Sequence, residues 1–252
     1  MSRHDGRDPG MITNEPERIR RVYAEYDADP EVQRRWDPAQ PGNLANRARL
    51  KGQLASVLPD VERMSILEIG CGPGDVLELM KEIGAREDHL SGVDLREEAI
   101  GQAGRRFPRA RLQVANAERL EFEDAAFDAV LLFTVLSSVL SRDSRESIAA
   151  EAIRVLRPGG VVVWYEMRLP NPWNRNVRPI GRGELGRLFP GLEPSLSSAT
   201  LIPQIARSLG PFTGLLFPAF HALPLLRSHW VGLIRKPTSG GAFRQAVARN
   251  RE

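Results

Sequence analysis

The residues most suggestive of chemistry surround a glycine-rich turn. Gly70, Gly72 and Gly74 alternate with other residues, and Glu68 stands two positions before the first of them. Glycines at this spacing let the backbone approach a bulky ligand and adopt conformations that other residues avoid. A dinucleotide-binding fingerprint would need a further glycine where Leu77 stands, so that fingerprint does not fit. The turn therefore predicts a site for a nucleotide-like ligand other than a dinucleotide.

A carboxylate follows this turn at a distance that suits ribose binding. Asp94 ends the apolar stretch "HLSGVDL" at 89–95, 20 residues past Gly74. A carboxylate at this place can accept charge-assisted hydrogen bonds from both ribose hydroxyls. A simple strand-to-helix connection can contain similar glycines, and the neighbouring motifs are what favour the ligand site.

Three stretches together resemble class I S-adenosylmethionine-dependent methyltransferases of the methyltransferase type 11 kind. The E-x-G-x-G-x-G turn resembles their motif I. "VANAERLEFEDAAFDAVLL" at 114–132 resembles the run that closes over the adenine, and "EAIRVLRPGGVVVWYE" at 151–166 resembles the helix and strand that follow. The resemblance covers residues 66–166 in the right order, and it implies that S-adenosylmethionine is the cofactor.

The resemblance also implies which residues would hold the cofactor. Leu95 would lie on the adenine face, Asn116 would accept a hydrogen bond from the adenine amine in place of the family's aspartate, and Ala117 would offer its backbone N–H. The complete implied set is Glu68, Gly70, Cys71, Gly72, Gly74, Asp94, Leu95, Asn116, Ala117, Glu118, Phe133 and Thr134.

A parallel sheet is needed to position these residues. Short apolar stretches predict strands at 64–70, 89–95, 110–115, 127–133 and 160–166, and helical spacing predicts helices at 96–106 and 143–155. Such alternation predicts an α/β fold with helices on both faces of the sheet. Ligands of such sheets bind at the carboxyl ends of the strands. The resemblance implies a Rossmann-like, doubly wound sheet of seven strands in the order 3-2-1-4-5-7-6, with the last strand antiparallel.

The rest of the chain extends this domain at both ends. We expect a tail at 1–13, an N-terminal helical cap at 14–60, the methyltransferase domain at 61–236 with an apolar insert at 203–226, and a C-terminal tail at 237–252. Tyr23, Tyr26 and Trp36 of the cap are expected to line a lid over the ligand site. The alternative is that the cap only packs against one face of the sheet.

His229 and Glu166 are the candidate catalytic pair. "RSHWVGLIRK" at 227–236 has the apolar character and terminal location of the family's last strand, whose start would lie at the active-site edge. His229 should then stand near Glu166 at the end of the fifth strand. A histidine supported by a carboxylate can act as general base toward a hydroxyl acceptor. The alternative is that the two residues only tie strand ends together.

The acceptor side carries a weaker resemblance. Residues 165–178 and the last strand are similar to a subgroup with a Tyr-Asp-Phe-Arg strand end, an Asn-Pro-x-Asn loop and a Leu-Arg-x-His last strand, often associated with glycoside, polysaccharide and natural-product biosynthesis. Glu166 replaces that subgroup's aspartate. The residues expected to contact the acceptor are Tyr26, Trp36, Tyr165, Arg168, Asn171, Trp173, Arg178 and His221.

Three classes of function remain open. A small-molecule O-methyltransferase is the first hypothesis, and a C- or N-methyltransferase of a natural-product intermediate is the second. The third is a non-catalytic module that binds S-adenosylmethionine or nucleic acid. The 35 Lys and Arg are interleaved with 32 Asp and Glu and form no block, which argues against nucleic acid. No Asp/Asn cluster requires a metal.

Composition indicates the compartment. Cys71 is the only cysteine, which excludes an internal disulfide and favours a reducing, cytoplasmic setting. The longest apolar stretches, at 129–140 and 215–226, fall short of the roughly 18 apolar residues that a membrane span needs. Because residues 1–10 are polar, we expect no secretory signal. The preference for Arg over Lys fits a GC-rich bacterial genome, and the sequence leaves the oligomeric state open.

Overall fold

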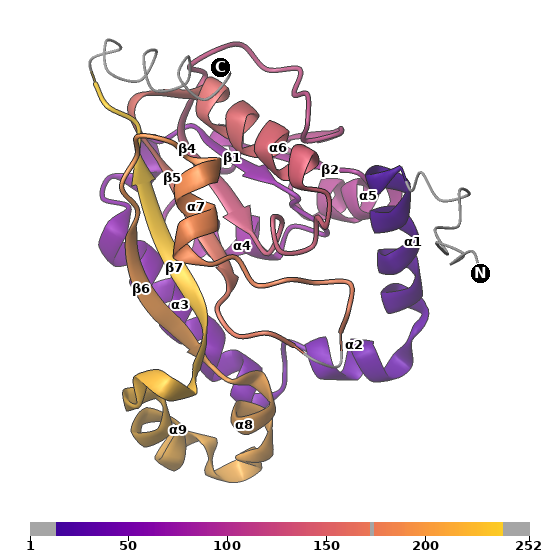
Figure 1. The fold of residues 1–252 in the computed structure, drawn as a ribbon. Helices are drawn as coiled ribbons and strands as arrows, with labels where there is room; N and C mark the ends of the chain where they lie inside the picture. The colour runs from indigo at the N-terminus through magenta and orange to yellow at the C-terminus, as the bar shows by residue number, and fades with distance from the viewer. Residues whose placement is uncertain (1–13, 172–173, 239–252) are drawn as a thin grey trace, which may run out of the picture.

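The computed structural model describes residues 14–171 and 174–238 and shows a seven-stranded mixed sheet (Figure 1). The strand order is β3-β2-β1-β4-β5-β7-β6, as predicted, and β7 is antiparallel to both of its neighbours. The strands are β1 (Ile66–Ile69), β2 (Leu90–Asp94), β3 (Arg111–Val114), β4 (Phe127–Phe133), β5 (Leu156–Met167), β6 (Ser195–Leu201) and β7 (Arg227–Arg235). The predicted Rossmann-like fold is confirmed.

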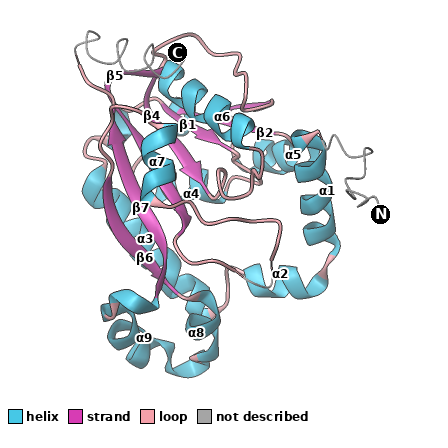
Figure 2. Cartoon of the chain, in the orientation of Figure 1, coloured by secondary structure: helices cyan, strands magenta, loops and turns pink. Residues whose placement is uncertain are grey.

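Helices cover both faces of this sheet (Figure 2). On one face, Leu132 and Trp164 pack against Ile148 of α6 (Arg142–Val155) and Leu185 of α7 (Arg182–Leu188). On the other face, the strands pack against buried residues of α3 (Pro41–Val57) and α4 (Asp75–Glu82), and α5 (Glu97–Arg106) lies beside β2 and β3. Apolar residues at successive strand positions thus serve two separate cores, because side chains alternate across a sheet.

The N-terminal segment forms three helices. α1 (Glu15–Ala28) and α2 (Pro30–Trp36) are followed by α3, and each has a proline in its first turn, where the missing N–H costs nothing. α3 packs against β6 and against α8 (Pro203–Ser208), so it belongs to the layer that covers the sheet. α1 and α2 lie toward one end of the sheet (Figure 1). Within the cap expected at 14–60, α3 therefore packs as the alternative describes, and the lid stays a prediction for α1 and α2.

Residues 203–226 connect β6 to β7 as a helical insert. It consists of α8, α9 (Thr213–Ala222) and short 3-10 turns at Gly210–Phe212 and Pro224–Leu226. β6 runs parallel to β5, because both are antiparallel to β7. The insert therefore lies at the same edge of the sheet as the carboxyl ends of the parallel strands. Within the part of the chain that the structure describes, no helix has the length and apolar character to cross a bilayer.

Candidate active site

The glycine turn connects β1 to α4 in backbone conformations that suit glycine. Gly70, Gly72 and Gly74 have φ values of +72°, +51° and +91°. The N–H groups of Gly70 and Cys71 donate to the carbonyl of Val93 at 2.8 and 3.0 Å, which holds the turn against β2. Because these φ values are strained for other residues, the sequence E-I-G-C-G-P-G leads directly to this turn.

The side chain of Asp94 is hydrogen-bonded to the glycine turn. Its carboxylate accepts hydrogen bonds from the backbone N–H groups of Gly72 and Arg96, each at 2.9 Å. Nε of Arg96 also lies 3.4 Å from Oδ1 as an ion pair. A carboxylate has about four lone-pair sites, so its two hydrogen bonds leave acceptor capacity for ribose hydroxyls. The side chain is only 12% exposed, which strengthens such bonds. Asp94 therefore meets the requirement for a ribose-binding carboxylate.

Glu68 lies beneath the turn and is buried. Its Oε2 atom has no hydrogen-bond partner among the described residues. Burial, followed by the nearby Asp75 and Asp94, raises the pKa of Glu68 well above its usual value. An unpaired buried oxygen favours a ligand that can donate to it. The glycine cradle, Asp94 and Glu68 together fit S-adenosylmethionine, which has an amino group, a ribose and no pyrophosphate.

The residues expected around the adenine lie at the ends of neighbouring elements. Leu95 is partly buried, directly after β2. Asn116 is exposed, and its Oδ1 accepts from the backbone N–H of Glu118 at 3.0 Å. Phe133 is buried at the end of β4, and Thr134 has a φ of +55°. These positions follow β2, β3 and β4, so the implied cofactor residues occupy one edge of the sheet.

Helix α1 crosses this edge and binds both of its sides. Tyr23 is within 3.3 Å of the hydroxyl of Ser138, which follows β4. The guanidinium of Arg96 lies over the Tyr23 ring at 4.8 Å and pairs with Asp27 at 2.8 Å. A Cβ added at Gly72 would stand 3.7 Å from Nη2 of Arg96, so this arginine covers the turn. Arg96 and Ser138 were missed by sequence reasoning, because nothing in the sequence pairs them with α1.

The loop after β5 also contacts the C-terminal half of α1, one turn beyond Tyr23. The hydroxyl of Tyr26 donates to Oδ1 of Asn174 at 3.0 Å and accepts from Asn176 at 3.3 Å. Trp36 packs edge-on against the Tyr26 ring, with 5.4 Å between ring centroids. Tyr23 in turn packs edge-on against Tyr26. The three aromatic residues of the predicted lid thus form one cluster, and half of the Trp36 surface is exposed.

Three aromatic rings form a row across β4, β5 and β7. The ring of Tyr165 stacks on Phe133 at 5.3 Å on one side and on His229 at 4.7 Å on the other. The hydroxyl of Tyr165 is 2.6 Å from that of Thr200. Burial lowers the pKa of His229 to about 4, so its imidazole is neutral at pH 7.

A hydrogen-bond chain sets the tautomer of His229. The hydroxyl of Ser228 donates to the carbonyl of Thr200 at 3.2 Å, and its oxygen lies 2.8 Å from Nδ1 of His229. Since the hydroxyl proton is used on Thr200, the Ser228 oxygen accepts the Nδ1 proton. This assignment leaves the lone pair on Nε2 of His229.

The expected pairing of His229 with Glu166 is wrong. His229 lies opposite Met167 in the β5–β7 register, whereas Glu166 lies opposite Trp230. Successive side chains point to opposite faces, so the two residues lie on different sides of the sheet. Glu166 is fully buried and accepts from the N–H groups of Leu136 and Ser137 at 2.7 and 3.2 Å. Burial raises the pKa of Glu166 to about 7. Its two hydrogen bonds hold the segment after β4 in place.

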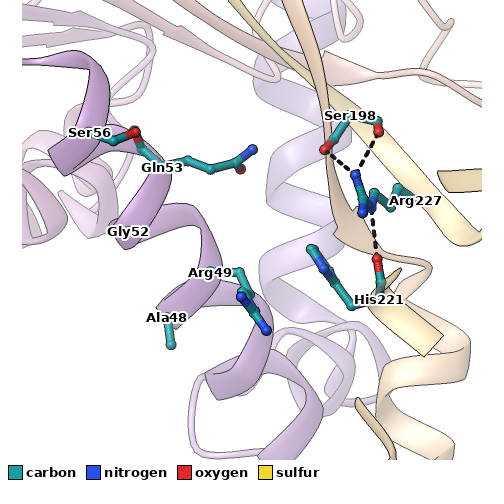
Figure 3. Close-up of a pocket in the computed structure, with 8 residues that line it drawn as sticks. All are labelled: Ala48, Arg49, Gly52, Gln53, Ser56, Ser198, His221 and Arg227. Carbon is teal, nitrogen blue, oxygen red and sulfur yellow. Dashed lines mark hydrogen bonds between the residues drawn. The ribbon is translucent and has the colours of Figure 1, made fainter. Parts of the chain in front are cut away.

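The other expected acceptor residues do not converge on one point. Arg168 donates to the carbonyls of Pro224 and Arg227, and Arg178 pairs with Glu184 at 2.6 Å. Asn171 lies in the loop after β5, and Trp173 falls outside the described residues. His221 lines a separate cleft, with a volume of about 330 Å³, between α3 and the β6–β7 end of the sheet (Figure 3). The structure therefore separates His221 from the glycine turn.

The comparisons with known proteins agree with this architecture. A family model described as a methyltransferase domain matches residues 66–160. The 27-O-demethylrifamycin SV methyltransferase of Amycolatopsis mediterranei is 27% identical over 191 residues, which are 71% of this chain and 68% of that protein. The ubiquinone biosynthesis O-methyltransferase of Maricaulis maris is 30% identical over 172 residues, 62% of this chain and 61% of that protein.

A solved structure resembles the whole fold. The 1,6-didemethyltoxoflavin-N1-methyltransferase of Burkholderia thailandensis, with its substrate and S-adenosylhomocysteine bound, has a TM-score of 0.61 at 18% identity and covers 92% of this chain and 93% of its own. Three other curated relatives are matched over only 30–43% of their length, so this chain spans less than half of each of them.

Proposed function

This chain is a class I S-adenosylmethionine-dependent methyltransferase that acts on small molecules, and from that premise we propose that it methylates a hydroxyl group with His229 as general base. The observation that carries the proposal is the neutral His229 with its lone pair on Nε2, at the start of β7. A hydroxyl is a weak nucleophile that gains most from a base, whereas an amine or an enolate is already activated.

In this proposal, different residues of the chain bind the cofactor and take the acceptor proton. S-adenosylmethionine supplies an electrophilic methyl group when it is bound. We assign Asp94 to the ribose hydroxyls and Glu68 to the amino group, because the first has free lone pairs and the second has an unpaired oxygen. We assign Nε2 of His229 to the acceptor proton. The stacked rings of Phe133 and Tyr165 hold the imidazole in one orientation, which aligns it with the acceptor.

Arg96 and α1 control access to the turn in this proposal. The guanidinium of Arg96 covers Gly72 and is held by Tyr23 and Asp27 of α1. The cofactor reaches the glycine turn only when this contact opens. Reclosure of α1 then excludes water from the site, a role that mobile elements commonly have in transferases.

Two relatives favour a hydroxyl acceptor, since one is named an O-methyltransferase and the other acts on a compound named as O-demethylated. A nitrogen acceptor is the alternative, since the solved structure with the similar fold is an N-methyltransferase. Incubation with S-adenosylmethionine and panels of phenols, polyketides and glycosides, followed by mass spectrometry, would identify products that gain one methylene unit. Fragmentation that locates the methyl group on nitrogen or carbon would refute the hydroxyl assignment.

A further inference from the structure

The insert between β6 and β7 exposes an unusual apolar surface. Ten large apolar residues are exposed among the described residues, and six of them fall between 212 and 225. Leu215 and Leu225 are the most exposed, at 76% and 80%. The six are Phe212, Leu215, Leu216, Phe220, Leu223 and Leu225. We refer to them as the insert surface; such a concentration marks an interaction site more often than scattered apolar residues do.

The charge around the insert surface has one sign. No Asp or Glu occurs between residues 194 and 238, the segment that holds β6, the insert and β7, although the chain has 32 in all. Burial, and after it the nearby charge of Arg35 on α2, lowers the pKa of Arg207 on α8. The segment from β6 to β7 that contains the insert therefore offers cations and no compensating carboxylates.

An arginine-lined cleft opens beside α9. Its walls include Arg49 and Gln53 of α3, His221 of α9 and Arg227 of β7 (Figure 3). Among the described residues, Arg227 donates only to neutral oxygens: the carbonyls of His221, Ala222 and Ser198, and the Ser198 hydroxyl. A cation held by carbonyls keeps its charge uncompensated and favours an anion nearby.

We propose that the insert surface docks on an anionic phospholipid bilayer, with the cleft lined by Arg49 and Arg227 receiving lipid phosphate. The apolar residues would enter the boundary of the acyl chains while the arginines contact headgroups, as interfacial helices do. A second copy of this chain fits less well, because two insert surfaces would bring the same uncompensated arginines together. The insert lies at the edge where the parallel strands end, so docking would turn that edge toward the bilayer.

The test is sedimentation of the full chain with vesicles of phosphatidylglycerol and phosphatidylcholine, compared with phosphatidylcholine alone. Binding should require phosphatidylglycerol and should weaken as salt is raised. The double substitution Leu215→Ser and Leu225→Ser should lower the partition coefficient at least about tenfold, because both residues would leave the bilayer. Val114→Ser changes an exposed apolar residue on β3, the outermost strand on the far side of the sheet from β6 and the insert, and should leave binding unchanged.

The charge contribution has its own control. Arg49→Gln should weaken binding about fivefold, the usual effect of one arginine at an anionic surface, while the exposed Arg63→Gln should not. No binding to phosphatidylglycerol vesicles would overturn the proposal, as would unchanged binding of the double leucine variant. A dimer in sedimentation equilibrium that the leucine changes dissociate, or saturable binding of inorganic phosphate without vesicle binding, would assign the surface to another occupant. None of these outcomes depends on methyl transfer.

Discussion

Replacement of Asp94 should nearly abolish cofactor binding. Its carboxylate holds the N–H groups of Gly72 and Arg96 at 2.9 Å each and is assigned to two ribose hydroxyls. Hydrogen bonds to a charged group contribute about 1.5–3 kcal/mol each, so the loss of two ribose contacts costs about 3–6 kcal/mol. That loss raises the dissociation constant by about 10²- to 10⁴-fold. Asp94→Asn, which keeps one acceptor oxygen, should lie between Asp94→Ala and the parent.

Isothermal titration with S-adenosylhomocysteine measures this effect directly. Glu97→Ala is the matched control, because Glu97 is an exposed carboxylate in the first turn of α5, three residues away. Thermal melting of each variant separates lost affinity from lost folding, since Asp94 also supports the free turn. A folded Asp94→Ala protein that binds with the parent's affinity would refute the assignment of Asp94 to the ribose.

Three further changes test other parts of the account. Asp27→Asn should speed cofactor association in stopped-flow measurements by about 1.5- to 5-fold, since an exposed ion pair contributes about 0.2–1 kcal/mol to closure; an unchanged rate would argue against gating by Arg96. Glu166 stays protonated in the folded protein up to a pKa of about 7 but ionises near 4.5 when unfolded, so the free energy of unfolding should fall as pH rises between these values. Glu166→Gln should remove that part of the slope in urea denaturation at pH 5 and pH 8, and an identical slope would contradict the burial argument. Ser228→Ala should lower kcat less than His229→Ala does and leave KM for the cofactor unchanged. The change removes the partner that fixes the His229 tautomer but keeps the imidazole itself. A change in KM alone would indicate a structural role for Ser228.

The sheet, and the edge at which the implied cofactor residues gather, could be predicted because their signals are local. The alternating glycines impose the turn, and the apolar strands place Asp94 and Phe133 at the same edge. β6, with the sequence SLSSATL, is half polar and showed no clear strand pattern. Its existence follows from the paired edge of β7, which only the assembled sheet provides.

The prediction that His229 pairs with Glu166 was wrong because of strand register. Placing β7 next to β5 was correct, but one residue of register decides which face a side chain occupies. Sequence could not tell whether His229 faces Tyr165 or Glu166. The contacts of α1 were equally hidden, since Tyr23 and Ser138 are 115 residues apart. Their meeting depends on how a helix packs over the finished sheet.

The single-turnover rate of methyl transfer in His229→Ala, measured from pH 5 to pH 9 with saturating cofactor and an acceptor from the product screen, tests the central claim most directly. We expect a rate about 10²- to 10⁴-fold below the parent, with cofactor affinity unchanged. The parent rate should show no inflection from His229 near its usual pKa of 6.5, because burial lowers that pKa to about 4. A His229→Ala enzyme with near-parent rates across this range would contradict the assignment of His229 as the base.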